Sequence, residues 1–434
     1  MTNRNRYQAI ESLAEVLPLF SSQSVVVMHS AFAEPAGLAA QLAEYADRLR
    51  GVQIYTLMSM GDIPYLPPAN AVAANIDAKQ PDGFSLTTFF PGSKIRQAIN
   101  DGRARLQPTY LSAIAGLFER GQIKADFLFL QLSPPDEQGN LSLGLSVDYM
   151  RAVMAQKPII IAEINPQMPR TSGDTIISAD QIDYVIEATQ PPQSMAVAGF
   201  DEVDDKIAAN VASLLDDGVV LQLGIGAIPD LTLAKIGHLQ YIGIHSGIIT
   251  QSLMPLMQAG VISNATKKEF TGKVVTTMAG GTPEFYEFLD NNTDFSFQPS
   301  SYTHNFDVLA KIDRLFAINS VLQIDLNGRA NAEKIGDRII SSAGGLPDFA
   351  RGATASKGGA SIIAMRSMTR RGDVSCIVRD LPASTPVSIN SDHIDYVVTE
   401  FGTARLRGLS ASARAKALIA IAHPDYRDEL GRQA

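Results

Sequence analysis

At 434 residues the chain is too long for one ordinary hydrophobic core, so two domains of about 200 residues each are expected. Hydrophobic residues make up 45% of the chain and charged residues 19%, which is typical of a globular protein. The formal net charge of −9 argues against nucleic-acid binding, which needs a broad basic face. A small anion remains a possible ligand, because a few backbone amides and one Lys or Arg can bind it locally.

The single cysteine, Cys376, excludes an internal disulfide and a multi-cysteine zinc site, and it fits a reducing compartment. Residues 1–18 mix charged and apolar side chains, so we expect no signal peptide. No stretch approaches the roughly 18 uninterrupted apolar residues of a membrane-spanning helix. The histidines lack metal-ligand spacing, so no metal site is expected. We therefore expect a cytoplasmic protein that does not bind membranes.

Short apolar runs alternate with helical patterns in the first half of the chain. Residues 24–28, 52–58, 127–132 and 158–162 are predicted strands, and residues 35–50 are a predicted helix. The strands lack strict alternation of apolar and polar residues, which is typical of strands buried on both faces. This pattern predicts parallel sheets that are covered by helices.

The second half of the chain begins again in the same way. Apolar residues fall on one face of a predicted helix at 202–216, which ends at Gly218, and a strand follows at 219–223. A polar, proline-containing stretch at 188–201 precedes this helix and is the predicted boundary between domains.

Two short apolar strings recur in matching order in the two halves. Residues 25–27 resemble 219–221, and residues 182–185 resemble 394–397. Chance similarity between short strings is the alternative, but two similar strings in the same order favour a duplication of the domain. We predict an α/β fold with two related domains that arose by internal duplication, and we expect them to span residues 1–190 and 200–434.

Residues 224–230 read Gly-Ile-Gly-Ala-Ile-Pro-Asp and lie between a predicted strand and a predicted helix. Glycines allow a sharp turn and a close approach of backbone amides to a ligand, and the following helix start favours negative charge. The segment lacks the third glycine of a dinucleotide-binding fingerprint. Taken alone, it is more typical of a tight turn than of a binding loop.

A second glycine-rich segment spans residues 342–361, where two glycine pairs flank Arg351 and Lys357. We predict one loop whose backbone amides bind an anion or a developing oxyanion. A flexible surface loop before the next strand is the alternative, and the residue types do not decide between the two.

Both glycine-rich segments, together with Gly-Ile-His-Ser at 243–246, occur in the order found in the acetyl-CoA hydrolase/transferase family. Further matching stretches lie at 133–136, 165–171, 317–320, 395–402 and 421–427. The chain therefore resembles this family over nearly its whole length. The family includes 4-hydroxybutyrate and butyrate CoA-transferases.

The resemblance implies two CoA-transferase-like domains with the active site between them. It also implies that the glycine-rich segments of the second domain hold CoA and the thioester. The residues expected to do so are Gly224, Ile225, Gly226, Ala227, Ile228, Gly344, Gly345 and Lys357.

One departure from the family falls at the expected catalytic position. A glutamate usually follows the His-Ser or His-Thr pair, but this chain has Gly247 after His245 and Ser246. In the family, that glutamate attacks the acyl-CoA carbonyl, and CoA then attacks the resulting anhydride to give a glutamyl-CoA thioester. Glycine has no side chain for either step.

Three explanations for Gly247 stay open. Glu34 or Glu163 replaces the missing carboxylate, although each is more often structural in such a position. Alternatively, water takes the place of the side chain and the reaction is hydrolysis, or the protein binds acyl-CoA without turnover. His245 is a candidate acid/base, with an oriented structural histidine as the alternative.

The sequence thus predicts a CoA-transferase that moves CoA from a short-chain acyl-CoA to a small carboxylic acid, with a C4–C5 acid or diacid expected by analogy. CoA is a substrate in this prediction, and no tightly bound cofactor is expected. An acyl-CoA thioester hydrolase and a non-catalytic acyl-CoA-binding protein are the alternatives. Family members are usually homo-oligomers, so a homodimer or homotetramer is expected.

Overall fold

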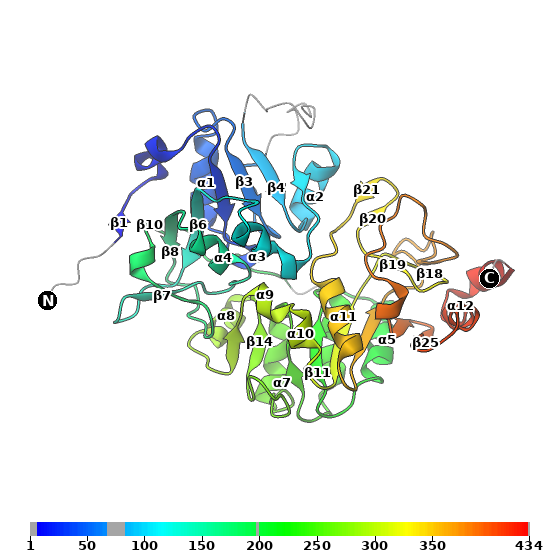
Figure 1. The fold of residues 1–434 in the computed structure, drawn as a ribbon. Coiled ribbons are helices and arrows are strands. Elements are labelled where there is room, and N and C mark those ends of the chain that lie inside the picture. Colours follow the sequence, from blue (N-terminus) through cyan, green and yellow to red (C-terminus); the bar gives the residue numbers. More distant parts are fainter. Residues whose placement is uncertain (1–6, 67–82, 197–198, 433–434) are drawn as a thin grey trace. The chain divides into compact units, whose positions relative to one another are not determined.

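The computed structural model describes residues 7–66, 83–196 and 199–432, and the structural statements below concern these residues. The chain divides into two compact units (Figure 1). Unit 1 comprises Met1–Met195 and Thr277–Ser301, and unit 2 comprises Ala196–Thr276 and Tyr302–Ala434. The division expected at residues 190–200 lies beside the first passage between the units. The return of residues 277–301 to unit 1 was not anticipated from the sequence.

Unit 1 is built on an eight-stranded sheet in which every neighbouring pair is parallel. Its strand order is β1-β10-β8-β6-β2-β3-β4-β5. The strands are β1 (Gln8–Ala9), β2 (Val25–Met28), β3 (Gln53–Thr56), β4 (Ser85–Thr88), β5 (Arg105–Leu106), β6 (Phe127–Leu132), β8 (Ile159–Ile164) and β10 (Tyr184–Glu187). All six residues of the central strand β6 are buried, as expected for a strand with helices on both faces.

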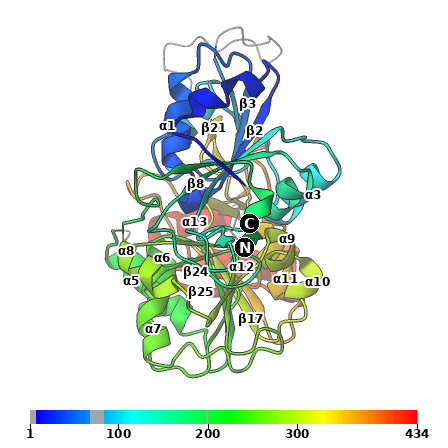
Figure 2. The ribbon, with the colours of Figure 1, turned by 90° about the vertical axis from the view of Figure 1, so that its left-hand side faces the viewer.

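Helices lie on both faces of this sheet. Unit 1 contains α1 (Ala36–Glu44), α2 (Ser93–Asn100), α3 (Leu111–Glu119), α4 (Met150–Ala155) and, from its returning segment, α8 (Pro283–Leu289). Figure 2 shows α1 and α3 on opposite sides of the strands. Right-handed crossovers explain this, because the chain moves along the sheet in one direction through α1 and in the other through α3.

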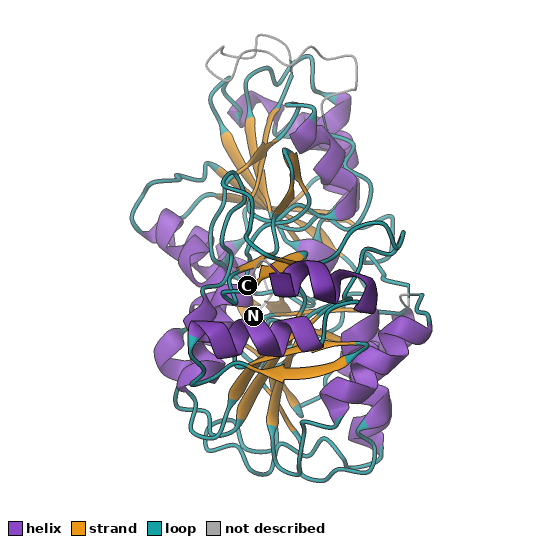
Figure 3. Ribbon diagram, turned by 90° about the vertical axis from the view of Figure 1, so that its right-hand side faces the viewer, coloured by secondary structure: helices purple, strands orange, loops and turns teal. Residues whose placement is uncertain are grey.

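Unit 2 contains a six-stranded sheet in the order β12-β11-β17-β22-β24-β25, which is parallel except for the edge strand β25. Figure 3 shows helices on both faces of this sheet. The strands are β11 (Val220–Leu223), β12 (Gly243–Ile244), β17 (Leu315–Asn319), β22 (Ala360–Ala364), β24 (Tyr396–Thr399) and β25 (Gly402–Arg405). The helices are α5 (Glu202–Ala212), α6 (Ala227–Lys235), α7 (Met254–Gln258), α10 (Phe306–Leu309), α11 (Leu346–Ala355), α12 (Ala411–Ala420) and α13 (Pro424–Arg432).

The two main sheets share one strand order. Strands β3-β2-β6-β8-β10 of unit 1 run in the same sequence as β12-β11-β17-β22-β24 of unit 2. The recurring strings at 25–27 and 219–221 lie in or lead into β2 and β11, and those at 182–185 and 394–397 lead into β10 and β24. This correspondence supports the predicted internal duplication. The predicted α/β fold with mainly parallel sheets is confirmed.

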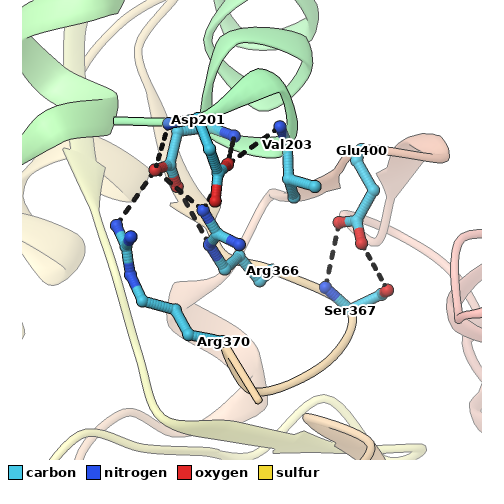
Figure 4. A network of polar contacts seen from close by, with 7 residues as sticks. Asp201, Val203, Arg366, Ser367, Arg370 and Glu400 are labelled. Atoms are coloured by element: carbon cyan, nitrogen blue, oxygen red, sulfur yellow. Dashed lines mark hydrogen bonds and ion pairs between the residues drawn. The ribbon is translucent and has the colours of Figure 1, made fainter. Parts of the chain in front are cut away.

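Helix α5 starts at Asp201, which caps it by accepting hydrogen bonds from the Val203 and Asp204 amides (Figure 4). Arg366, which follows β22, places its Nε 3.0 Å from Asp204 Oδ1. Arg370 donates to the other oxygen of the same carboxylate at 3.0 Å. These contacts fix the start of α5 against the end of a central strand.

None of the helices within the described ranges combines the length and the hydropathy that a bilayer span requires.

Candidate active site at the carboxyl end of the second sheet

The first glycine-rich segment forms the turn between β11 and α6. Gly226 has a φ of +125°, a conformation that L side chains rarely adopt, so glycine is required there. No side chain caps the start of α6, and its first-turn amides are therefore not used by a capping group. A helix start of this kind attracts negative charge. Ile225 at the tip of the turn is 44% exposed.

Polar contacts behind this turn hold it in place. Asp230 in α6 accepts hydrogen bonds from Thr250 Oγ1 at 3.1 Å and from Ser252 Oγ at 2.7 Å. On the other side, the Gly224 amide donates to the Ile318 carbonyl at 3.0 Å. The turn is therefore anchored at both ends, which keeps its amides in a fixed direction.

The second glycine-rich segment is not the single loop that the sequence predicted. Residues Leu346–Ala355 within it form helix α11, which begins after Gly345, has Pro347 in its first turn and buries Phe349. Proline near a helix start and several alanines within it favour this helix. The prediction of one continuous anion-binding loop is wrong, because α11 separates the two glycine pairs.

Lys357 lies at the opposite end of α11 from Gly344 and Gly345. Its carbonyl accepts a hydrogen bond from the Arg314 amide, just before β17 begins, and so it stands at the amino end of the sheet. A helix of ten residues is about 15 Å long. The structure does not bring Lys357 together with the glycines, so a role in CoA binding requires a ligand that extends along α11.

Gly247 lies level with Gly224 at the carboxyl end of the sheet. Strands β11 and β12 pair with Leu221 opposite Ile244, and the Ser246 hydroxyl then bonds both the carbonyl and the amide of Leu223, at 3.1 and 3.3 Å. Ser246 is buried and continues the strand pairing through its side chain. It is a structural residue that fixes Gly247 beside the turn.

The side chain of His304 fills the space between Gly247 and Gly345. A Cβ atom placed on Gly247 would lie 2.6 Å from His304 Nε2, and one placed on Gly345 would lie at the same distance from that atom. Real Cβ atoms do not approach other atoms so closely, so glycine at both positions makes room for the imidazole. The Gly247 segment and the start of α11 therefore meet at His304.

His304 is held in a defined orientation. Its ring packs against Phe349 of α11 with centroids 4.7 Å apart, and its Nδ1 lies 2.8 Å from Thr303 Oγ1. Only 2% of the residue is exposed. Sequence reasoning missed His304 as a site residue because the Tyr-Thr-His-Asn stretch around it matches no motif, and only the fold brings it to the two glycines.

His245 uses its ring within the fold. Its Nε2 lies 3.0 Å from the Thr303 carbonyl. Burial, followed by the nearby positive charge of Lys267, lowers the pKa of His245 to about 3, so the imidazole is neutral and donates to that carbonyl. This hydrogen bond accounts for a structural role, in which His245 positions the residue before His304. An acid/base role for His245 stays a prediction.

Lys267 is a second group that the sequence did not single out. Its ammonium donates to the carbonyls of Ile244 at 2.8 Å and Lys273 at 2.7 Å. Burial lowers the pKa of Lys267 to about 7. It lines a cavity of about 440 Å³ together with His245 and Tyr302. This cavity also reaches Val220 at the start of β11 and therefore extends toward the amino end of the sheet.

A paired amide contact completes the carboxyl edge. Asn319 at the end of β17 donates to Gln222 Oε1 at 2.7 Å, and Gln222 donates back to Asn319 Oδ1 at 3.1 Å. A Cβ atom on Gly224 would stand 3.7 Å from Asn319 Oδ1, which is an ordinary contact. A polar side chain therefore lies directly behind the first glycine.

The two candidate carboxylates both belong to unit 1. Glu34 follows β2 and accepts a hydrogen bond from the Tyr65 hydroxyl, and Glu163 on β8 accepts one from the Leu38 amide in the first turn of α1. Burial raises the pKa of each to about 7, against the opposing effect of these hydrogen bonds. Glu163 thus stabilises a helix start, and Glu34 has a fixed structural partner. A nucleophilic role for either carboxylate stays a prediction.

Across the part of the chain that the structure describes, no group of three or more His, Cys, Asp or Glu side chains could hold a metal ion.

Comparison with known proteins gives a consistent picture. The family model of the acetyl-CoA hydrolase/transferase N-terminal domain matches residues 1–196, and that of the C-terminal domain matches residues 281–434. The chain is 38% identical to 4-hydroxybutyrate coenzyme A transferase of Clostridium kluyveri, over 94% of this chain and 93% of that protein. It is 36% identical to succinyl-CoA:acetate/propanoyl-CoA:succinate CoA transferase of Fasciola hepatica, over 94% and 84% of the two chains.

Solved structures agree with the sequence comparisons. The crystal structure of RipA from Yersinia pestis superposes with a TM-score of 0.87 at 31% identity, covering 100% of this chain and 99% of RipA. Both family domains and full-length relatives above 30% identity are thus matched. This protein therefore belongs to the acetyl-CoA hydrolase/transferase family.

Proposed function

We propose that this protein is a CoA-transferase that moves CoA from a short-chain acyl-CoA to a small carboxylic acid. The names of the relatives support this reaction, since they transfer CoA among 4-hydroxybutyrate, succinate, acetate and propanoate. The acceptor that we favour is a C4–C5 acid or diacid. We also propose that the protein works in the cytoplasm as a homodimer or homotetramer, as is usual in the family.

The observation that carries the proposal is the arrangement at the carboxyl end of the second sheet. Two helices, α6 and α11, start at glycines without a side-chain cap, and Gly247 lies beside both segments. Ligands of open α/β sheets bind at this edge. Amides at such helix starts stabilise the negative charge of phosphate groups and of the oxyanion that forms when a thioester carbonyl is attacked.

Hydrolysis of acyl-CoA is the second candidate, and one observation favours it. Gly247 carries no carboxylate, so the covalent route through a glutamate at this position is closed. Water would then be the acceptor in place of a carboxylic acid. Binding of acyl-CoA without turnover is the remaining alternative.

The test is to incubate the protein with acetyl-, butyryl- or succinyl-CoA, with and without added acetate, butyrate, 4-hydroxybutyrate or succinate, and to follow the CoA thioesters by mass spectrometry. We expect a new CoA thioester only when a second acid is present. Free CoA released without an acid would support hydrolysis. Binding of acyl-CoA without either product would support the alternative of a non-catalytic acyl-CoA-binding protein.

A matched pair of variants tests the location of the site. A Cβ on Gly224 meets only ordinary contacts, so Gly224→Val should fold while narrowing the approach to the turn. We expect its KM for acyl-CoA to rise about tenfold or more, because a ligand displaced by about 1 Å loses much of its productive geometry. Gly237→Val, at a turn where a Cβ has equal room, is the control and should leave KM unchanged. Equal KM values for the two variants would contradict this location.

A further inference from the structure

The cavity beside Lys267 has the size of a small-molecule site. Its volume of about 440 Å³ falls within the range of roughly 300–1,000 Å³ that is typical of ligand pockets. The residues that line it all belong to unit 2. Among the described residues around it, none belongs to the Gly224 turn, to α11 or to position 247. This cavity is therefore distinct from the candidate active site at the carboxyl edge.

Most of the cavity wall is apolar. Val220 lines it from the start of β11, and Val308 and Ile312 line it from the segment before β17. The rings of Phe270 and Tyr302 add an aromatic wall, in which they pack edge to face with centroids 5.7 Å apart. These walls favour a ligand with an apolar body, because burial of apolar surface on both sides stabilises the complex.

Lys267 supplies the polar end of the cavity. A Cβ on Gly243 would stand 3.2 Å from Cγ and Cδ of Lys267, so the glycine makes room for the stem of the lysine. The ammonium donates to the Ile244 carbonyl at 2.8 Å and to the Lys273 carbonyl at 2.7 Å. An ammonium group has three N–H donors, and these two carbonyls occupy two of them. The third donor is left for an acceptor inside the cavity.

The charges around the cavity favour an anion as that acceptor. Lys268 is paired with Asp313 at 2.7 Å, and Glu269 accepts a hydrogen bond from a tyrosine hydroxyl at 2.8 Å. Lys267 and Lys311 have no carboxylate partner within the described ranges. Burial lowers the pKa of Lys267 to about 7, and an anion beside the ammonium would offset this cost of desolvation.

We propose that this cavity is a second ligand site, which binds a monocarboxylate with an aliphatic or aromatic body. The carboxylate accepts the third hydrogen bond of Lys267, and the exposed ammonium of Lys311 adds attraction. The apolar body lies against the aliphatic and aromatic walls. The ligand is a carboxylic acid, as is the proposed acceptor, but its binding here does not depend on the CoA-transferase function.

Photoaffinity labelling of the full-length wild-type protein tests the location. The probe is 4-benzoylbenzoate, an aromatic carboxylate that forms a covalent cross-link under ultraviolet light, and peptide mass spectrometry identifies the labelled residues. We expect cross-links at residues 266–270 and 302–313. Hexanoate should suppress them, whereas hexylamine and inorganic phosphate should not, because the first lacks the negative charge and the second lacks the apolar body.

Variants of the lysines test the polar end. We expect Lys267→Met to reduce cross-linking at these residues about tenfold or more, because a hydrogen bond to a charged group is lost. Lys311→Glu, which reverses an exposed charge at the cavity, should reduce it about threefold. Lys416→Glu is the matched control, since it reverses the charge of an exposed lysine on α12 of the same unit, and it should leave the labelling unchanged.

Circular dichroism checks that each variant folds. If Lys267→Met does not fold, the wild-type cross-links and the comparison of Lys311→Glu with Lys416→Glu decide the question. Cross-links confined to other residues, or equal labelling of wild type and a folded Lys267→Met, would overturn the site. Equal suppression by hexylamine or phosphate would overturn the ligand class. Absence of CoA transfer by the wild-type protein would remove the function proposed above and leave this site standing.

Discussion

Gly247 and His304 illustrate how a fold couples residues that are far apart in sequence. The resemblance to the family identifies position 247 as unusual, but only the structure shows that an imidazole from residue 304 occupies the adjacent space. The two positions are separated by more than fifty residues and share no motif. Sequence reasoning could therefore identify the missing carboxylate at position 247, but it could not identify His304 as the neighbouring side chain.

The close approach of His304 predicts a stability effect at Gly247. A Cβ in Gly247→Ala would collide with Nε2, and overpacking of this kind costs about 1–3 kcal/mol of unfolding free energy. Urea denaturation measures this loss. Gly431→Ala in α13, where a Cβ meets nothing within 4 Å, is the control and should change the free energy by less than about 0.5 kcal/mol. If both variants behave alike, the imidazole does not fill the space that we assign to it.

Glu34 gives a prediction about pH. Its pKa is raised to about 7 by burial, so between pH 4.5 and 7 the folded protein holds this proton more tightly than the unfolded chain. Stability due to Glu34 is therefore lost as pH rises through that interval. The amide introduced by Glu34→Gln does not titrate. We therefore expect the unfolding free energy of this variant, relative to that of wild type, to rise by about 2 kcal/mol from pH 5 to pH 7.

Urea unfolding at the two pH values measures this difference. Other buried groups also titrate, including Glu163 in the same direction and His29, whose pKa burial lowers to about 4, in the opposite direction. They are common to both proteins and cancel in the comparison. Parallel stability curves for wild type and Glu34→Gln would show that the carboxyl group is not protonated in the folded state.

At the scale of helices and strands, the apolar runs predicted most of the sheet correctly, and α11 is the informative failure. The glycines on both sides of α11 and Gly352 within it indicate a loop by local preference, although Pro347 in the first turn and the alanines favour a helix. Tertiary packing outweighs that preference. A Cβ on Gly352 would lie 2.4 Å from Leu309, so glycine there lets α11 pack directly against α10, while Phe349 fills the core beneath. The helix or loop preference of a segment is judged from residues close in sequence, so it does not include the contact between Gly352 and Leu309.

The start of α5 yields a prediction at this scale. Asp204 is 2% exposed and receives Arg366, whose side chain is 15% exposed, and Arg370, whose side chain is 61% exposed (Figure 4). Removing the buried partner in Arg366→Met should cost about 2–4 kcal/mol, because the carboxylate stays buried with a weaker partner. Arg370→Met, the matched control, should cost at most about 1 kcal/mol. Equal losses in urea denaturation would contradict this difference.

At the scale of the whole molecule, the sequence predicted the α/β class and the duplication, because equivalent strands of the two sheets have similar short apolar sequences. It did not predict that unit 1 is discontinuous. Residues 277–301 contribute α8 and several buried aromatic side chains, and their Ser300 amide donates to the Asp148 carbonyl at 2.8 Å. The local pattern of apolar residues predicts a strand or a helix, but it does not indicate in which of the two hydrophobic cores that element is buried.

This discontinuity predicts the behaviour of fragments. Residues 1–195 alone lack the buried rings of Phe285 and Phe295, each worth about 1.5–3 kcal/mol, and we expect no cooperative thermal transition by circular dichroism. The same fragment joined through a flexible linker to residues 277–301 should recover a transition. The control is that fusion with both phenylalanines changed to alanine, which should not recover it. A cooperative transition in residues 1–195 alone would contradict the assignment of the returning segment.

The return of residues 277–301 also has a consequence for synthesis in the cell. The nascent chain cannot complete its amino-terminal half when residue 195 leaves the ribosome, because the closing segment is still untranslated. At about 5–20 residues per second, the intervening stretch delays completion by several seconds. During that interval the incomplete core exposes apolar surface, and chaperones have their best opportunity to act on this polypeptide.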